Sequence, residues 1–135
     1  MRSVSYNPEM SDPKPGKRVL LIDDDESLRE LFELALGKRF NVAVAEDGVL
    51  GLAKVAAFKP HLIVLDLMMP HLNGFEVIHK LQAGDSKDIP VIVITGYSDK
   101  ANEGIVTMEQ NVVAFFHKPL TFDELIAKID GLLAA

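Results

Sequence analysis

The feature that most constrains the fold is a regular alternation of short apolar runs with longer amphipathic segments from residue 18 onward. Three of the runs are continuously apolar and rich in β-branched residues, which is typical of parallel strands buried on both faces. The strand-like runs are 19–22, 41–45, 62–65, 91–94 and 113–116. We therefore expect five strands.

Each strand-like run is followed by a segment in which apolar residues recur at helical spacing. These segments are 28–36, 50–57, 75–81, a weaker one over 98–110 that contains Gly104, and 121–133. Gly37 is a natural end for the first helix. Thr121 is predicted to cap the last helix in a capping box with Glu124. The order is thus a strand and a helix repeated five times.

That order predicts one α/β domain, a doubly wound (βα)5 fold with a parallel sheet and helices on both faces. We place this domain at residues 18–135. Residues 1–17 contain several prolines and no periodic apolar pattern, so we predict a flexible N-terminal leader there.

Composition excludes several classes of function. The net charge of −6 argues against a nucleic-acid surface, because phosphate contacts need clustered Lys and Arg. The chain has no cysteine, which excludes disulfides and thiol chemistry. Its apolar runs are far shorter than the roughly 20 residues that span a bilayer, and residues 1–17 carry no secretory signal. We expect a soluble cytoplasmic protein without membrane contact.

Polar residues follow four of the five strand-like runs. In open α/β sheets, ligands bind beyond the carboxyl ends of the strands. The residues predicted at that edge are Asp23, Asp24 and Asp25 after the first strand, Asp66 after the third, Thr95 after the fourth and Lys118 after the fifth.

The aspartates suggest a site for a divalent cation. Carboxylates crowded together repel one another unless a cation neutralises them, and Mg²⁺ prefers oxygen ligands of this kind. The alternative is that strand-end aspartates begin turns and cap helices, which we favour for Asp25. For Asp23 and Asp24 we favour the metal site.

Asp66 is an isolated carboxylate delivered by a buried strand, and it could act as a ligand or a nucleophile; the alternative is a loop-capping role. Lys118 needs a counter-charge at the end of a buried strand, which the acidic group supplies, unless it is simply a surface lysine. Thr95 alone would usually be structural. The four histidines show no metal-ligand spacing, and we assign none of them to catalysis.

Together and in this order, these pieces resemble bacterial two-component response-regulator receiver domains of the chemotaxis-regulator type. The motifs are VLLIDDDESLR at 19–29, LDLMMP at 65–70 with Gly74 following, ITGY at 94–97 and FFHKPL at 115–120. The resemblance covers residues 18 to about 133. It implies a flavodoxin-like strand order of 2-1-3-4-5.

The resemblance also implies roles for individual residues. Asp66 matches the phosphoacceptor, which takes a phosphoryl group from a phosphohistidine or a small phosphodonor. Asp24 matches the direct Mg²⁺ ligand and Asp23 its acidic partner. Met68 matches the position whose backbone carbonyl completes the metal site. Lys118 matches the lysine that pairs with the phosphoryl group.

Two further positions match the family's switch residues. Thr95 matches the hydroxyl that bonds the phosphoryl oxygen, and Phe115 matches the aromatic residue that fills the space Thr95 vacates. The bond between Lys118 and Pro119 is typically cis in the family. The implied output is a population shift on the face formed by the fourth helix, fifth strand and fifth helix.

The implied partners are a sensor histidine kinase or phosphotransfer protein and a downstream effector. The domain would be a monomer or a weak dimer through that same face. It would be a signalling domain and not an enzyme, catalysing only its own phosphorylation and slow dephosphorylation.

The sequence departs from the family pattern in two places. The usual Gly-Ala pair before the fifth strand is replaced within residues 111–114, and the preceding segment is about one residue longer than usual. Bulky Met68 and Tyr97 each lie two residues after a site residue, Asp66 or Thr95. They could hinder the water that hydrolyses the acyl phosphate, which predicts slow dephosphorylation.

Three other interpretations fit the sequence less well than a phosphoacceptor domain. A haloacid-dehalogenase-type phosphatase would need a second acid where Met68 stands. A flavodoxin-type FMN binder would need a hydroxyl- and glycine-rich loop where the three aspartates stand, and these would repel phosphate. A degenerate receiver that serves only protein interaction is disfavoured by the intact set of Asp24, Asp66, Thr95 and Lys118.

Overall fold

The computed structural model describes residues 16–69, 71–96 and 100–134, without the side chains of 100–102. Five strands alternate with five helices in chain order. The elements are β1 (Arg18–Ile22), α1 (Glu26–Leu36), β2 (Asn41–Ala45), α2 (Gly48–Phe58), β3 (Leu62–Asp66), α3 (Gly74–Gln82), β4 (Val91–Thr95), α4 (Lys100–Val106), β5 (Val112–His117) and α5 (Phe122–Leu133). In the described part of the chain, no helix combines the length and the apolar character needed to cross a membrane. The predicted fold class is confirmed.

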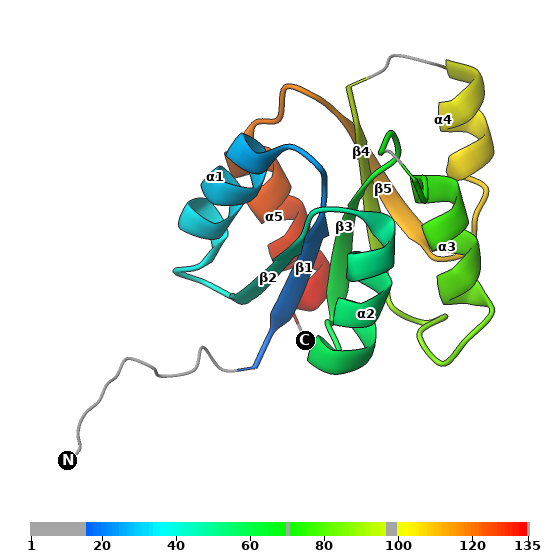
Figure 1. Cartoon of the computed structure of the whole chain (residues 1–135). Coiled ribbons are helices and arrows are strands. Elements are labelled where there is room, and N and C mark those ends of the chain that lie inside the picture. The colour runs from blue at the N-terminus through cyan, green and yellow to red at the C-terminus, as the bar shows by residue number, and fades with distance from the viewer. Residues whose placement is uncertain (1–15, 70, 97–99, 135) are drawn as a thin grey trace.

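All five strands are parallel and lie in the order β2-β1-β3-β4-β5, as predicted (Figure 1). Each strand pairs in register with its neighbours, apart from one bulge in β5. In particular, Ile22 of β1 lies opposite Leu65 of β3, and Asp66 lies opposite Ile94 of β4. The carboxyl ends of the central strands therefore finish at the same level.

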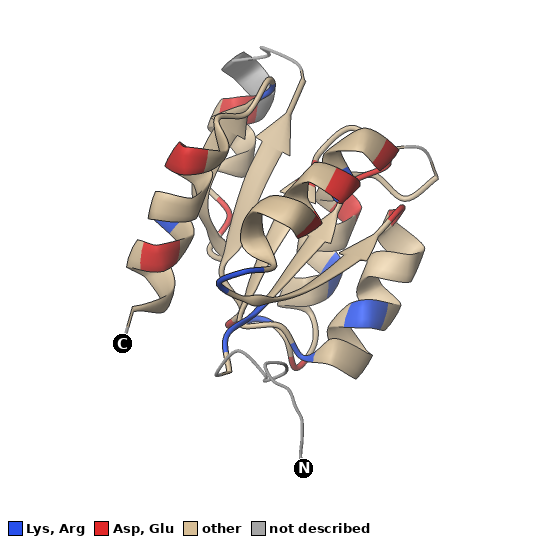
Figure 2. Cartoon of the chain, turned by 90° about the vertical axis from the view of Figure 1, so that its left-hand side faces the viewer, with Lys and Arg blue, Asp and Glu red and all other residues tan. Residues whose placement is uncertain are grey.

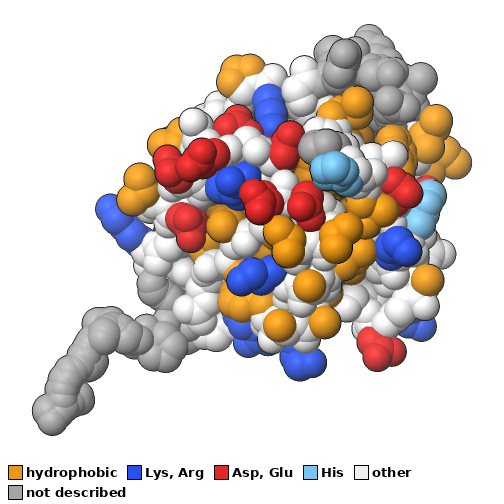
Figure 3. Space-filling model, in the orientation of Figure 1, with side chains coloured by type: hydrophobic (Ala, Val, Ile, Leu, Met, Phe, Trp, Pro, Cys, Tyr) orange, Lys and Arg blue, Asp and Glu red, His pale blue; other side chains and the backbone are white. Residues whose placement is uncertain are grey.

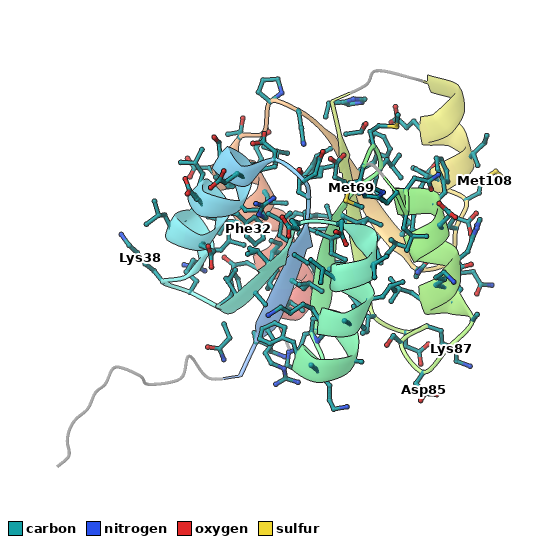
Figure 4. All side chains as sticks on the ribbon, in the orientation of Figure 1. Phe32, Lys38, Met69, Asp85, Lys87 and Met108 are labelled. Atoms are coloured by element: carbon teal, nitrogen blue, oxygen red, sulfur yellow. The ribbon has the colours of Figure 1, made fainter. Side chains whose placement is uncertain are left out.

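Two layers of helices cover the sheet. Helices α1 and α5 pack on one face, and α2, α3 and α4 pack on the other (Figure 1). Successive residues of β1 alternate between the two cores: Val19 and Leu21 face α1 and α5, whereas Leu20 and Ile22 face the other layer. Phe32 anchors α1 to the sheet and is fully buried (Figure 4).

The fourth helix is shorter than the sequence pattern predicts. The predicted range was 98–110, but α4 ends at Val106, and residues 97–99 lie outside the described part of the chain. The Thr107 hydroxyl donates to the Glu103 carbonyl at the helix end. The residues between α4 and β5 are held by α3, because the Gln82 side-chain amide donates hydrogen bonds of 2.9 Å to both Glu109 and Asn111.

The strand that follows contains a bulge. Val91 pairs with Val112 but Ile92 pairs with Ala114, so Val113 is left out of the register. A β-bulge inserts one extra residue into a strand and bends it. This bulge absorbs one residue, which agrees with the extra length expected before the fifth strand.

The predicted cap of α5 is confirmed in its position but not in its hydrogen bonding. Thr121 is the N-cap residue of α5, but its side chain makes no capping hydrogen bond, so the predicted capping box with Glu124 is absent. A capping box does form on α3, where Asn73 and Glu76 exchange hydrogen bonds of 3.0 and 3.1 Å.

The close contact between α2 and β1 leads to a stability prediction. A Cβ at Gly51 would lie 2.5–2.9 Å from three side-chain atoms of the buried Ile22, whereas a Cβ at Gly131 would meet nothing within 4 Å. Both glycines lie inside helices, so alanine gains the same helix propensity at each. We expect Gly51→Ala to lower the free energy of unfolding by about 1–3 kcal/mol, and Gly131→Ala to raise it by up to about 1 kcal/mol. Urea unfolding followed by circular dichroism tests both, and equal effects of the two substitutions would contradict the contact.

Candidate functional site

Three aspartates meet at the carboxyl edge of the sheet. Asp23 follows β1, Asp24 follows it directly, and Asp66 ends β3, which is the neighbouring strand. One carboxylate oxygen from each lies within 4.8 Å of the others. Figure 2 marks the acidic residues in red, including those in the loops above the strand tips. The structure thus brings together the carboxylates that the sequence placed at this edge.

Asp23 is held at every polar atom and is fully buried. Its backbone N–H donates to the Ala45 carbonyl at 3.0 Å, and its Oδ1 accepts from the Asp25 N–H at 2.8 Å. Its backbone carbonyl accepts from Arg29 Nη1 at 2.9 Å. Its Oδ2 forms an ion pair with Lys118 Nζ at 2.9 Å. The β1–α1 turn is therefore rigid at this residue.

Asp66 is only 3% exposed. Its Oδ1 accepts from the Met68 backbone N–H at 3.1 Å, and its Oδ2 lies 3.5 Å from Lys118 Nζ. The Met68 main chain therefore lies beside the acidic cluster, where the metal-ligand prediction places it. The Met68 side chain points outward and is 48% exposed.

The loop after Asp66 is tightly packed against the start of α3. The Gly74 N–H donates to the Leu67 carbonyl at 3.0 Å. A Cβ at Gly74 would lie 2.6 Å from Leu67 Cα and 2.8 Å from the Asp66 carbonyl oxygen. Only glycine fits there without moving the backbone that carries Asp66.

Lys118 comes from the edge of the sheet, because it follows β5, the last strand in the order β2-β1-β3-β4-β5. Its backbone N–H donates to the Thr95 carbonyl at 2.8 Å, which fixes the chain there. The Lys118–Pro119 peptide is cis. The ammonium lies between Asp23 and Asp66, with the side chain 24% exposed.

Burial and mutual repulsion set the charge state of the site. Burial, followed by the nearby Asp23 charge, raises the pKa of Asp66 to about 6, although the Met68 N–H and Lys118 act in the opposite direction. Burial alone would lower the pKa of Lys118, but the carboxylates of Asp23 and then Asp66 raise it above its ordinary value. The lysine is therefore a permanent cation, while Asp66 is poised near neutral pH.

The donor set fits a divalent cation. The three carboxylates lie close together, and only Lys118 forms ion pairs with them among the described residues, with Asp23 and Asp66, so the negative charge of the cluster exceeds the positive charge paired with it. The buried Asp23 Oδ2 receives no aligned hydrogen bond in this part of the chain and depends on the ion pair alone. An oxygen-only set of carboxylates with solvent on one side suits Mg²⁺, which keeps several waters.

The two predicted switch residues lie on neighbouring strands. Thr95 is the last residue of β4, is 2% exposed and pairs with His117 in register. Phe115 lies on β5, partly buried against the core beneath α2, α3 and α4. Its ring meets the His117 ring edge-on, with centroids 5.2 Å apart.

The histidines lie outside the acidic cluster. His61 accepts from the Arg18 N–H at 2.9 Å before β3, and burial, followed by Arg18 and Lys17, lowers its pKa. His79 pairs with Glu109, and His117 pairs with Glu103 at 3.5 Å.

The sequence predicted the local role of Asp25 but not that of Arg29. Asp25 caps α1, accepting from the Leu28 N–H at 3.3 Å, so that prediction is confirmed. The contact of Arg29 with Asp23 was missed. Its only sequence signal is its position as the fourth residue of α1, about one turn into the helix that follows Asp23.

Comparison with known proteins gives one consistent answer. Residues 19–130 match the response regulator receiver domain family. The chain is 35% identical over 117 residues to the response regulator MprA of Mycobacterium tuberculosis, covering 86% of this chain and 50% of the relative. It thus spans about half the length of the curated relatives it matches.

Solved structures agree in fold. The receiver domain of the Francisella response regulator 1452 is 26% identical, with a TM-score of 0.78 over 87% of this chain and 96% of the other. The chemotaxis protein CheY4 of Vibrio cholerae, at 24% identity, has a TM-score of 0.80 over 87% and 98% of the two chains. With the strand order and the clustered aspartates, these matches lead to one conclusion: the chain belongs to the response-regulator receiver domain family of two-component signalling.

Proposed function

We propose that this receiver domain accepts a phosphoryl group on Asp66 in a Mg²⁺-dependent reaction. The observation that carries the proposal is the arrangement around Lys118 Nζ, which lies 2.9 Å from Asp23 and 3.5 Å from Asp66. Asp24 completes an acidic cluster beside the same two carboxylates. One cation and one nucleophilic carboxylate thereby face the same small space.

The reaction we propose is an in-line phosphoryl transfer. An Asp66 carboxylate oxygen forms a bond to phosphorus while the bond to the donor breaks, either P–N in phosphohistidine or P–O in an acyl phosphate, and the donor keeps the electron pair. Lys118 would neutralise a phosphoryl oxygen as a point charge. Asp23, Asp24, Asp66 and the Met68 carbonyl would hold Mg²⁺. When bound, Mg²⁺ would supply Lewis-acid stabilisation of the phosphoryl oxygens.

The proposed switch uses Thr95 and Phe115. The Thr95 hydroxyl would bond a phosphoryl oxygen, and the Phe115 ring would take the space that Thr95 leaves. Phe115 contacts His117, which pairs with Glu103 of α4. A movement of the Phe115 ring would therefore displace His117 and alter its contact with α4. The readout is therefore a population shift on the face formed by α4, β5 and α5.

The proposed phosphodonor is a sensor histidine kinase or a phosphotransfer protein. A groove beside Lys118 supports contact with such a protein. It is lined by apolar side chains of α1 and of the segment leading into α5, among them Leu28, Leu31, Leu120 and Phe122. Leu31 is 53% exposed, so part of this apolar wall is open to a partner protein.

Further proposals follow from family membership. The domain would occupy residues 18–135, with 1–17 as a leader, and would act in the cytoplasm as a signalling domain, not as an enzyme with a separate substrate. It would control a partner or effector, as a monomer or a weak dimer through the α4–β5–α5 face. We propose no direct contact with nucleic acid.

The central test is phosphorylation by acetyl phosphate, measured by intact mass. We expect one phosphoryl group on the wild-type protein with Mg²⁺ and none with excess EDTA. Asp66→Asn removes the nucleophile and should abolish the adduct, whereas Asp85→Asn, at an exposed loop far from the cluster (Figure 4), should behave as wild type. An adduct of equal yield in Asp66→Asn would contradict the assignment.

The raised pKa of Asp66 predicts a pH-dependent stability. Because the folded-state pKa of about 6 exceeds the ordinary 3.8, the ionised carboxylate destabilises the fold above pH 6, and the effect fades as the pH falls toward 4. We expect Asp66→Asn to raise the free energy of unfolding by about 1–3 kcal/mol at pH 8. The gain should shrink at pH 4.5 and also when Mg²⁺ is added to the wild type. Urea unfolding at both pH values measures it, and a destabilised variant at pH 8 would oppose the account.

The exposed Met68 side chain predicts a long-lived acyl phosphate. Its bulk beside Asp66 should hinder the attacking water, as should Tyr97, which lies outside the described residues. We expect Met68→Asn to lose the phosphoryl group several-fold faster than wild type once the donor is removed. Met108→Asn is the control, because Met108 is 83% exposed at the end of α4 (Figure 4). Equal decay rates in all three proteins would remove the idea.

A further inference from the structure

We infer that Arg29 is a positioning residue for the acidic cluster, acting on Mg²⁺ affinity through the Asp23–Asp24 peptide. This inference rests on the proposed function, because it concerns the same metal site. The contact that carries it is the hydrogen bond from Arg29 Nη1 to the Asp23 backbone carbonyl, 2.9 Å long and partly buried.

The contact matters because of which peptide it holds. The Asp23 carbonyl and the Asp24 N–H belong to one planar peptide unit, so fixing that oxygen fixes the plane from which Asp24 departs. The other polar atoms of Asp23 are already held by Ala45, Asp25 and Lys118. The hydrogen bond from Arg29 adds a direct restraint on the peptide that joins Asp23 to Asp24.

Asp24 is the carboxylate that needs such support. It is exposed, whereas Asp23 and Asp66 are buried, and yet its carboxylate lies within the same 4.8 Å cluster. An exposed side chain on a free turn would sample several directions. A turn held by Arg29 restricts the backbone from which the Asp24 side chain extends toward the other two carboxylates, and such preorganisation strengthens binding.

The Arg29 side chain is half-buried. Together with Val44, Ala45 and Glu46, at and just beyond the end of β2, it lines a surface groove. Its planar guanidinium can keep one N–H directed at a carbonyl while the stem packs on apolar surface. On the face in Figure 3, acidic side chains gather over the region of α1 and the neighbouring loops, with basic side chains between them.

A pure charge effect of Arg29 would have the opposite sign. A positive charge beside the cluster repels Mg²⁺, so removing it without other consequences would tighten binding. A positioning role predicts weaker binding on removal, despite the lost repulsion. The direction of the change in Mg²⁺ affinity therefore separates the two explanations.

The experiment is a Mg²⁺ titration of the full chain followed by amide NMR shifts, in wild type, Arg29→Met and Arg29→Lys. Arg29→Met keeps the apolar stem and removes the donor, and we expect its dissociation constant for Mg²⁺ to rise roughly tenfold. Arg29→Lys keeps a donor and the charge and should recover part of the loss. Arg39→Met removes the same charge from an exposed position on the surface and should bind as wild type.

A second measurement separates positioning from general damage. If Arg29 acts through the metal site, saturating Mg²⁺ should return the initial rate of phosphorylation by acetyl phosphate in Arg29→Met to near the wild-type rate. Unchanged or tighter Mg²⁺ binding in Arg29→Met would overturn the inference while leaving the proposed function intact. A defect that saturating Mg²⁺ does not repair would also overturn it. If Arg29→Met does not fold, Arg29→Lys and Arg29→Gln decide by the same criteria, and a wild type that binds no Mg²⁺ would overturn both proposals.

Discussion

The ion pairing of Lys118 with Asp23 and Asp66 is the interaction on which this edge of the molecule depends. Two buried carboxylates 2.9 and 3.5 Å from one ammonium are tolerable only because that cation lies between them. The pairing joins the ends of β1, β3 and β5, three strands from different parts of the chain. Removing the lysine would leave two like charges buried side by side without compensation.

The rest of the fold supplies the geometry for this meeting. Parallel strands with the order β2-β1-β3-β4-β5 finish at one level, so residues that follow the apolar runs arrive together. The glycine at 74 lets the loop after β3 lie against α3, and the contacts around Asp23 make the β1–α1 turn rigid. The same arrangement leaves more negative charge than Lys118 can balance, which is the physical basis for proposing a divalent cation there.

Sequence reasoning succeeded where the signal was local and repeated. Continuous apolar runs predicted the strands, and the rule that ligands bind beyond strand ends selected Asp23, Asp24, Asp66 and Lys118 before any coordinates. It failed where a contact depends on distant packing. The chain that follows the short α4 is fixed by Gln82 of α3, and the contact of Arg29 depends on how α1 leaves the turn after β1, so neither could be predicted from spacing alone.

Burial beside another carboxylate raises the pKa of Asp66, and a bound cation should lower it again. The most direct test is a pH titration of the Asp66 carboxyl carbon by ¹³C NMR, with and without Mg²⁺. We expect a midpoint near pH 6 without the metal and a clearly lower midpoint with it. A midpoint near the ordinary 3.8 that Mg²⁺ leaves unchanged would contradict this expectation.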